Sequence, residues 1–329
     1  MTPEPARSLE GEARRPESAG PASIWVLADP RAGTAAQALG IAERLPVPHR
    51  VVPLEWGVLA RLPFPFPTLA GLTPQARSAF APPWPRLVLS AGRRSAPVAA
   101  WLQARGARVV HCMRSPLAGR FALNILGRHD DPPAQPNILA ILGAAHRISP
   151  LRLAEARPAW AELESLPRPR IGLLLGGPIR GEGLSPGIAA GIGARVAGFG
   201  GSVMATASRR TGAAATKALA GALAPVPHRL HAWGDAGPNP LLGFMAWADL
   251  LVVSGDSVSM LSESLVTTAP VFVAPLGEEG RRHLALHESL YAAGQARPLS
   301  AAPGPFMRPA LDEVGRIAAE IAARGLLDV

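Results

Sequence analysis

Short apolar runs that alternate with longer alanine-rich stretches are the feature that most limits how this chain can fold. In the first half the apolar runs occupy residues 23–29, 50–54, 87–91, 109–112 and 138–142. Helical candidates such as 34–45 and 96–105 lie between them. Most of the runs are continuously apolar, as expected for parallel strands that are covered on both faces. The alternation therefore predicts an α/β fold built on a parallel sheet.

The pattern stops after about 150 residues and then starts again. Residues 151–160 have a helical pattern, and 166–170 read as a linker because closely spaced prolines cannot continue a helix. Further strands are then expected at 171–175, 202–207, 229–233, 250–253 and 271–275, with helices at 187–199, 213–223, 257–266 and 281–293. We predict two Rossmann-like, doubly wound parallel-sheet domains that face a cleft.

The predicted boundaries follow from these breaks in pattern. Residues 1–22 are rich in Pro, Glu, Arg and Gly and read as a disordered tail. An N-terminal, acceptor-side domain is expected over 23–165 and a C-terminal, nucleotide-binding domain over 166–300. The remaining segment, 301–329, contains a helix with one apolar face, which we expect to pack back onto the first domain.

Composition narrows the class of protein. A chain of 329 residues is long enough for two domains, and no apolar stretch approaches the roughly 18 residues of a membrane-spanning helix. The net charge of +9 is almost wholly arginine, which a GC-rich genome or selection for anion binding would each explain. No zinc-finger spacing or aromatic RNA-binding motif is present, so nucleic acid is not an expected partner. A single cysteine and the lack of an export signal favour a cytoplasmic protein.

The most informative motif follows the apolar run at 250–253. It reads Ser254-Gly255-Asp256-Ser257-Val258-Ser259-Met260-Leu261-Ser262-Glu263, and a helix is expected to begin near Ser257 or Ser259. Serine hydroxyls and free N–H groups at a helix start can hold a phosphate. Because Glu263 lies four residues after Ser259, the two share a helix face, and the carboxylate can accept hydrogen bonds from ribose hydroxyls. We predict that Ser257, Ser259, Met260 and Glu263 contact a donor nucleotide; the alternative is a capped helix with a solvated Glu263.

A second motif follows the strand expected at 171–175. The sequence Gly176-Gly177-Pro178-Ile179-Arg180 places adjacent glycines where a backbone can approach a ligand closely. Arg180 is predicted to pair with a diphosphate, since guanidinium and phosphate form charge-assisted hydrogen bonds. An ordinary glycine turn is the alternative.

Two further loops in the second half complete the predicted nucleotide site. Ser208, Arg209 and Arg210 follow the strand at 202–207 and combine hydroxyl and cationic groups suited to phosphate. Asn239 lies in the loop after the strand at 229–233, where it can cap the next helix and contact the base. A solvated arginine and a plain loop are the alternatives.

Loops in the first half are predicted to face the cleft from the acceptor side. The sequence favours Asp29 as the general base, because it follows the first strand and precedes a helix. A structural aspartate that caps its own turn is the alternative. The accompanying acceptor-side residues are Arg31, Gly33, Gln37, Arg93 and Arg94. No pair of carboxylates has the spacing of a catalytic metal site, so we expect neither a metal nor a cofactor.

Aromatic side chains crowd one region of the first half. Five of them stand close to three arginines and three prolines: Trp56, Phe64, Phe66, Phe80 and Trp84, beside Arg61, Arg77 and Arg86. Rings next to cations suit a headgroup interface, so an anionic membrane surface or a lipid acceptor at the inner face of the membrane is an expected partner. Packing of the rings into a local core is the alternative.

Seven motifs in order resemble the mitochondrial fission protein family first described in plants, which has many bacterial members. They are Asp29-x-Arg31-Ala32-Gly33, Gly92-Arg93-Arg94-Ser95-Ala96-Pro97, Gly143-Ala144-x-His146-Arg147, Gly176-Gly177-Pro178, Ser208-Arg209-Arg210-Thr211, Asn239-Pro240 with Gly243, and Asp256-Ser257-Val258-Ser259-Met260 with Ser262-Glu263. The resemblance covers residues 24–300 and implies a fold similar to that of GT-B glycosyltransferases. The chain departs from the family at Thr34, at 111–114 and at Gly255.

Two functions follow from these expectations. The first is a metal-independent glycosyltransferase that uses a nucleotide-sugar donor, with an envelope lipid or polysaccharide precursor as acceptor. The second is a catalytically silent GT-B scaffold that binds a protein partner or a nucleotide, as the plant role of the family suggests. Binding of a nucleotide-sugar or nucleoside diphosphate is expected for the first, and turnover separates it from the second.

Overall fold

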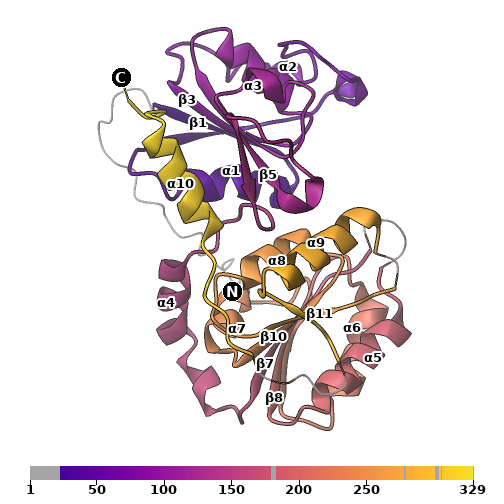
Figure 1. The fold of residues 1–329 in the computed structure, drawn as a ribbon. Coiled ribbons are helices and arrows are strands. Elements are labelled where there is room, and N and C mark those ends of the chain that lie inside the picture. The colour runs from indigo at the N-terminus through magenta and orange to yellow at the C-terminus, as the bar shows by residue number, and fades with distance from the viewer. Residues whose placement is uncertain (1–22, 179–182, 278, 301–303, 305, 329) are drawn as a thin grey trace, which may run out of the picture.

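The computed structural model describes residues 23–178, 183–277, 279–300, 304 and 306–328. In this part of the chain two six-stranded parallel sheets lie one above the other, with helices on both faces of each (Figure 1). The prediction of an α/β protein with two doubly wound parallel sheets is confirmed. We call the part around the first sheet the first half and the part around the second sheet the second half.

The first sheet has the strand order β2-β1-β3-β4-β5-β6. Its strands are β1 (Ile24–Ala28), β2 (His49–Pro53), β3 (Leu87–Ala91), β4 (Arg108–Cys112), β5 (Leu123–Gly127) and β6 (Ile138–Ile141). The helices of this half are α1 (Ala32–Ala42), α2 (Pro74–Arg77), α3 (Ala96–Gln103) and the 3-10 turns η1 (Val58–Arg61), η2 (Ala118–Arg120) and η3 (Arg128–Asp130).

The second sheet has the order β12-β11-β10-β7-β8-β9. Its strands are β7 (Arg170–Leu175), β8 (Ser202–Ala207), β9 (His228–His231), β10 (Leu250–Ser254), β11 (Val271–Ala274) and β12 (Arg297–Pro298). The helices of this half are α4 (Pro150–Ala159), η4 (Ala161–Ser165), α5 (Pro186–Ala197), α6 (Ala213–Leu223), α7 (Leu241–Trp247), α8 (Val258–Ser264) and α9 (Arg281–Ala292). The last helix, α10 (Glu313–Ala323), packs on the first sheet.

Alternation along each strand divides the core between the two faces of a sheet. In β1, Ile24 and Val26 face a cluster that α1 and α10 complete, whereas Trp25 and Leu27 face a cluster completed by α3. Neighbouring side chains of a strand point to opposite faces, so a strand apolar throughout its length can bury both. The second sheet is covered in the same way by α5 and α6 on one face and by α8 and α9 on the other.

Two short strands were not predicted from the sequence. β5 carries Asn124 in its buried interior, and its side-chain amide donates to the backbone oxygen of Asn137 at 3.3 Å. β12 is only two residues long and begins with Arg297. Both segments lack the apolar run by which the other strands are recognised.

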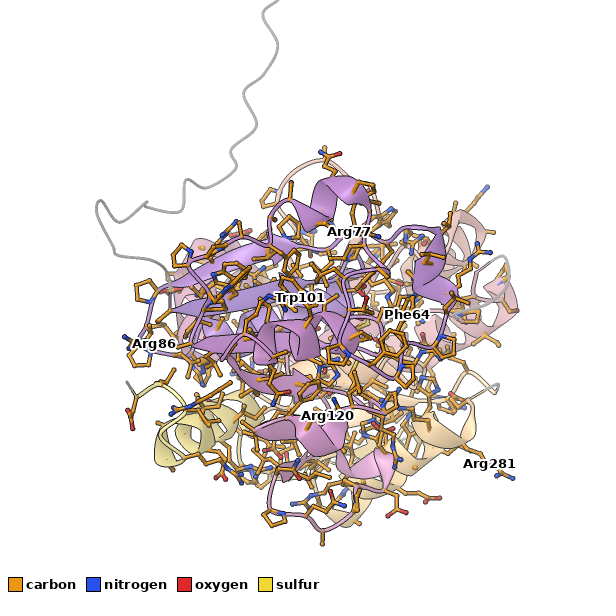
Figure 2. The ribbon with its side chains drawn as sticks, turned by 90° about the horizontal axis from the view of Figure 1, so that it is seen from above. Phe64, Arg77, Arg86, Trp101, Arg120 and Arg281 are labelled. Atoms are coloured by element: carbon orange, nitrogen blue, oxygen red, sulfur yellow. The ribbon has the colours of Figure 1, made fainter. Side chains whose placement is uncertain are left out.

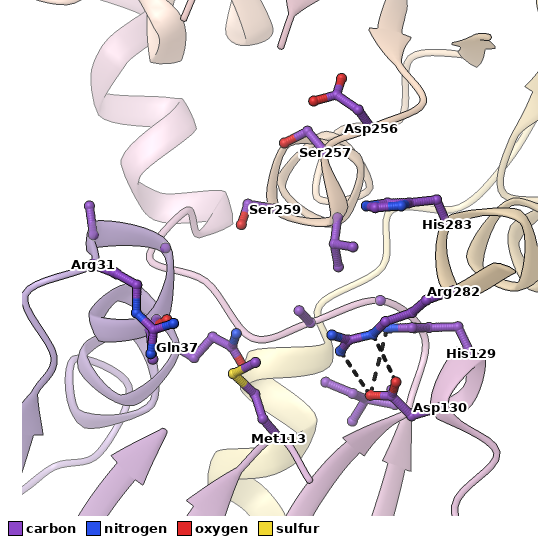
Figure 3. A pocket seen from close by; sticks show the side chains of 18 of the residues that line it. Arg31, Gln37, Met113, His129, Asp130, Asp256, Ser257, Ser259, Arg282 and His283 are labelled. Carbon is purple, nitrogen blue, oxygen red and sulfur yellow. Dashed lines mark hydrogen bonds and ion pairs between the residues drawn. The ribbon is translucent and has the colours of Figure 1, made fainter. Parts of the chain in front are cut away.

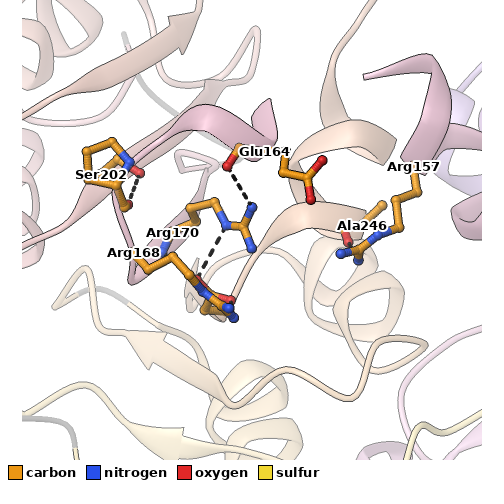
Figure 4. A network of polar contacts seen from close by, with 8 residues as sticks. Arg157, Glu164, Arg168, Arg170, Ser202 and Ala246 are labelled. Atoms are coloured by element: carbon orange, nitrogen blue, oxygen red, sulfur yellow. Dashed lines mark hydrogen bonds and ion pairs between the residues drawn. The ribbon is translucent and has the colours of Figure 1, made fainter. Parts of the chain in front are cut away.

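The chain first crosses from one half to the other just after β6. Ser149 caps α4, and this helix then packs against α7 of the second half, where Trp247 Nε1 donates to the Arg157 oxygen at 2.9 Å. The proline-rich segment 166–170 is also attached to the second half (Figure 4). There the Arg170 N–H donates to Asp249 at 2.8 Å, and Ser202 Oγ donates to the Pro167 oxygen at 2.7 Å. We propose that any hinge lies at 143–149, ahead of the predicted boundary at 165/166.

A second crossing returns the chain to the first half. The buried Arg308 guanidinium donates to backbone oxygens of Ser264, Leu265 and Ala269 at 2.8–3.1 Å, which fixes this segment to the second half. Five residues later α10 begins and buries its apolar face against the first sheet. Glu313 at its start accepts a hydrogen bond from the Leu142 N–H at 2.7 Å, so the two crossings lie side by side.

The aromatic region lies at the end of the first half that is turned away from the second half (Figure 2). Phe80 and Trp84 pack edge-to-face against Trp25 and Trp101, as the local-core alternative expects. Phe66, by contrast, is 52% exposed. None of the helices in the described ranges is long and apolar enough to cross a bilayer.

Candidate functional site

A cleft of about 790 Å³ separates the carboxyl ends of the two sheets (Figure 3). The carboxyl ends of parallel strands share one edge of a sheet, so the loops that follow them gather there. The first half contributes the start of α1 and the loops after β5 and β6. The second half contributes the loops after β8 and β10 and the start of α9. Residues far apart in the sequence thus share one cavity.

Among the residues that the structure describes, four arginines line the cleft, and three of them already contact a carboxylate. The nearest atoms are 2.9 Å apart in Arg31–Asp29, 3.1 Å in Arg210–Asp256 and 2.8 Å in Arg282–Asp130. Arg209 is exposed and has no carboxylate partner within the described part of the chain. Of these four arginines, Arg209 is therefore the one whose guanidinium an anionic ligand can bind without competition from a carboxylate.

The acceptor-side residues predicted from the sequence divide into two groups. Arg31, Gly33 and Gln37 line the cleft. Arg93 and Arg94 instead line a separate cavity of about 100 Å³ beside the aromatic region. The loop with Arg31 follows β1 and the loop with Arg93 and Arg94 follows β3, but the two loops do not line the same cavity.

Asp29 is buried beneath the cleft and does not belong to its lining. Its carboxylate accepts hydrogen bonds from Arg31 N and Nε at 2.9 Å and from Trp56 Nε1 at 3.2 Å. Burial alone would raise the pKa of Asp29, but these hydrogen bonds and the Arg31 charge outweigh it and lower the pKa below its usual value. A carboxylate held in this way is a weak base, and its geometry serves to fix Arg31.

The glycines after β7 are occupied by protein groups. The Gly176 N–H donates to Ser254 Oγ at 2.7 Å, and the Gly177 N–H donates to Asp256 Oδ2 at 2.9 Å. A Cβ on Gly177 would lie 2.2 Å from the Arg210 oxygen, so this position requires glycine because another loop approaches it closely. These N–H groups thus hold Ser254 and Asp256 instead of pointing at a ligand. Arg180 lies outside the described residues.

The start of α8 borders the cleft. Ser257 is the N-cap residue, and its Oγ accepts from the Met260 N–H at 3.3 Å. Ser257 and Ser259 both line the cleft, whereas Met260 lines the next cavity along. Asp256 precedes them, and its Oδ1 is buried without a hydrogen-bond partner among the described residues.

The neighbouring cavity of about 480 Å³ lies at the ends of β8 and β9. Ser208 and Asn239 line it, together with the exposed ring of Trp233. Asn239 Oδ1 also accepts from the Leu241 N–H at 3.0 Å, at the start of α7. Thr206 Oγ1 is buried at this cavity and has no hydrogen-bond partner in the described chain. The cavity thus offers a flat aromatic surface and an unpaired polar group.

Glu263 lies three residues after Met260 on α8 and so shares a helix face with this residue of the 480 Å³ cavity, but the half-buried Glu263 is not itself part of the lining. Burial raises the pKa of its carboxyl from 4.5 to about 7. No side-chain hydrogen bond to Glu263 occurs within the described ranges. A carboxyl with such a pKa can accept a hydrogen bond or donate one at neutral pH.

Several cleft residues were missed by sequence analysis. They are His129 and Asp130 in η3 and Arg282 and His283 at the start of α9. The loop of η3 was overlooked because β5, which precedes it, was not predicted. The run Arg281-Arg282-His283 was a usable signal, because two arginines followed by a histidine at a helix start are unusual. No group of three or more His, Cys, Asp or Glu side chains in the described chain is placed to hold a metal ion.

Solved structures share this architecture at low sequence identity. MurG from Acinetobacter baumannii is 12% identical, with a TM-score of 0.50 over 93% of this chain and 92% of that chain. Arabidopsis thaliana UGT89C1 complexed with UDP is also 12% identical, with a TM-score of 0.50 over 93% of each chain. These likenesses establish a GT-B fold.

Sequence comparison supplies the family. The curated mitochondrial fission protein ELM1 of Arabidopsis thaliana is 27% identical over 295 residues, which span 78% of this chain and 68% of the relative. The family model described as mitochondrial fission ELM1 matches residues 32–325. Together with the motifs at both edges of the cleft, this match shows that the chain belongs to the mitochondrial fission ELM1 family.

Proposed function

We propose that this protein binds a nucleoside-diphosphate sugar and transfers its glycosyl group to a hydroxyl acceptor. The observation that carries the proposal is the 480 Å³ cavity with the buried, unpaired Thr206 hydroxyl inside it. The Glu263 carboxyl, whose pKa is raised, lies one helical turn from Met260 of the lining. Buried polar groups without partners cost stability and are rare, so they point to a missing ligand. The structure of UGT89C1 in complex with UDP gives a precedent for nucleotide binding in this fold.

The nucleoside fits the 480 Å³ cavity. The base stacks on Trp233, since an exposed indole offers a flat apolar face to an aromatic ring. Thr206 Oγ1 supplies a donor and an acceptor to the nucleoside. Glu263 accepts hydrogen bonds from ribose hydroxyls, which would replace the water that its burial excludes.

The diphosphate occupies the border between the two cavities. Ser208 lines the smaller cavity, and the next residue, Arg209, lines the cleft. In the same way Met260 lines the smaller cavity, and its neighbour Ser259 lines the cleft. A nucleotide in the smaller cavity therefore extends its phosphates toward Arg209 and Ser259. The free guanidinium stabilises the charge of the leaving diphosphate.

The cleft then holds the sugar and the acceptor. Burial lowers the pKa of His283, so its ring is neutral at pH 7 and can accept a proton. In the proposed step the acceptor O–H gives its proton to His283, the oxygen attacks the anomeric carbon, and the nucleoside diphosphate departs with the bonding electrons. Asp29 positions Arg31 and takes no part in proton transfer.

A catalytically silent scaffold remains the competing function, because three of the four cleft arginines are already neutralised. Such a protein would bind a nucleotide or a protein partner without turnover. Release of nucleoside diphosphate from a nucleotide-sugar distinguishes the two.

Calorimetry with UDP, GDP, CDP and ADP tests the nucleotide site. Arg209→Gln is expected to weaken binding about 10-fold, and Glu263→Ala about 5- to 100-fold, because each removes a hydrogen bond worth roughly 1–3 kcal/mol. Lys217→Gln removes an exposed charge on α6, away from both cavities, and should leave affinity unchanged. Absence of binding by all four nucleotides would refute the proposal.

A further inference from the structure

One corner of the cleft has chemistry that the nucleotide does not use. It lies between η3 of the first half and the start of α9 of the second (Figure 3). His129 and Asp130 come from η3, and Arg282 comes from α9. The diphosphate proposed above lies instead beside Arg209 and Ser259.

The start of α9 is prepared for an anion. Arg281, Arg282 and His283 occupy its first turn, which has no acidic residue and no side-chain cap. Cations at this end of a helix interact unfavourably with the helix dipole, and an anion would offset that cost. The backbone N–H groups of Arg281 and Arg282 have no acceptor among the described residues. Unsatisfied N–H groups of a first turn are the usual ligands of an oxyanion.

A second, independent observation comes from His129 on the opposite wall. Its side chain is only 1% exposed, yet neither ring nitrogen has a hydrogen-bond partner within the described chain. The nearest carboxylate oxygen, Asp130 Oδ2, lies 3.9 Å from Nε2, which is too far for a hydrogen bond. Nδ1 faces Gly127, where an added Cβ would lie 2.5 Å from it, so Nε2 on the side of Asp130 is the unpaired nitrogen that can meet a polar ligand group of the cleft.

Arg282 can serve this ligand without leaving Asp130. Its Nε lies 2.8 Å from Asp130 Oδ1, and its Nη2 donates to Oδ2 at 2.9 Å. A guanidinium has five N–H donors, so Nη1 stays available while the carboxylate holds the plane of the group. The Arg282 side chain is 48% exposed, so its remaining N–H groups stay accessible from the cleft while the carboxylate of Asp130 holds it.

We infer that this corner, formed by Arg282, His129 and the first turn of α9, binds an oxyanion in addition to the nucleotide's diphosphate. The occupant is a phosphate or carboxylate group carried by the transferred sugar or by the acceptor. This assignment of substrate class rests on the proposed function, but the oxyanion site itself does not. Arg282 and His129 bind the group and orient it beside His283.

Titration with inorganic phosphate tests the site directly. In protein saturated with the nucleoside diphosphate that binds best, phosphate should bind, and Arg282→Gln should weaken it at least about 10-fold through loss of a charge-assisted hydrogen bond. His129→Phe should weaken it severalfold. Arg281→Gln is the matched control: it keeps the backbone N–H of Arg281 and removes only a side chain that carries the same charge on the same turn but points outward at the rim of the molecule (Figure 2). Its effect should stay below about 3-fold, since an exposed charge is screened.

The outcomes separate this inference from the nucleotide proposal. Equal losses in Arg281→Gln and Arg282→Gln, or no phosphate binding at millimolar concentration, would overturn the oxyanion site even if nucleotides bind. Phosphate binding lost only in Arg209→Gln would mean that phosphate enters the diphosphate site, which also overturns it. If no nucleotide binds, the same titration on free protein still tests the corner. Circular dichroism of each variant shows that it is folded, and Arg282→Lys, which keeps the charge, should recover part of the affinity.

A second comparison identifies where the oxyanion comes from. If the donor sugar carries it, Arg282→Gln should weaken UDP-glucuronic acid binding by at least about 10-fold while UDP-glucose binding is unchanged. If the acceptor carries it, both donors are unaffected and only phosphate binding falls. Either result supports the site. If Arg282→Gln changes neither the binding of the two donors nor the binding of phosphate, the site is contradicted.

Discussion

Glu263 shows how burial sets the chemistry of a single side chain. Its carboxyl is placed on α8 with no charged partner among the described residues, and its pKa rises to about 7 for that reason. The sequence predicts the helix face on which this residue lies, because Glu263 follows Ser259 by four residues. It cannot show the raised pKa, which depends on groups that pack around the helix from other segments.

The stability of the protein should depend on the ionisation of Glu263. A carboxyl whose pKa is higher in the folded than in the unfolded chain stabilises the fold fully below about pH 4.5, and this contribution disappears as the pH rises to about 7. Each pKa unit corresponds to about 1.4 kcal/mol, so the full effect is of the order of 3 kcal/mol. Glu263→Gln stays neutral and should unfold with less pH dependence than the wild type. Parallel pH profiles of the two proteins in urea unfolding would show that Glu263 is not the titrating group.

The contacts of Asp29 could not be predicted from the residues around it in the sequence. Its place after β1 and before α1 favoured a general base, and the same place also allowed a turn aspartate. Trp56, which donates to its carboxylate, lies 27 residues away in the sequence, so no local pattern could reveal that contact. Tertiary contacts of this kind decide which carboxylate is free to accept a proton.

At the scale of elements, apolar runs predicted the strands well where burial was complete. All five residues of Leu87–Ala91 are buried, and the predicted and observed bounds agree. β5 was missed because Asn124 interrupts its apolar pattern, and the loss of this strand also hid the η3 loop. The incomplete strand assignment therefore kept His129 and Asp130 out of the predicted site.

The loop around η1 supports a membrane prediction. Val58, Leu62 and Phe66 are exposed, at 88%, 54% and 52%, on a segment that also carries Arg61. Exposed apolar side chains beside a cation favour insertion at an anionic surface. We expect the wild type to float with phosphatidylserine vesicles at low salt, and a Leu62→Ser, Phe66→Ser double variant to float several-fold less.

Leu151→Ser provides the control for this surface, because Leu151 is 64% exposed but lies on α4 of the second half. It should float like the wild type. Equal flotation by all three proteins would show that the η1 loop is not the contact, and no flotation of the wild type would remove a membrane acceptor from the proposal.

At the scale of the whole molecule, close contacts between the halves hold the cleft in its shape. Gly143 has φ +89°, and a Cβ there would lie 2.5 Å from Ser262 Oγ of the second half. The Ala144 N–H also donates to this Ser262 Oγ at 2.9 Å. Because the contact lies in the proposed hinge, it couples local geometry to the relative position of the two sheets.

Gly143→Ala should therefore destabilise the protein and loosen the cleft. Gly106→Ala is the matched control, since Gly106 has φ +96° but no atom of the described chain lies within 4 Å of the place that a Cβ would take. The control should cost about 1–2 kcal/mol from backbone strain alone. Gly143→Ala should cost clearly more and increase the radius of gyration in solution scattering. Equal losses of stability and unchanged scattering would show that Ser262 simply moves aside.

The double crossing of the chain bears on how the protein is made. Val314, Ile317 and Ile321 of α10 belong to the core of the first sheet, so the sheet face that α1 covers in part is completed only after α10 has been synthesised. The second half contains all the strands of its own sheet before α10 is synthesised, and nothing in its core waits for that helix. The first half is therefore synthesised first, but its hydrophobic core is completed after that of the second half.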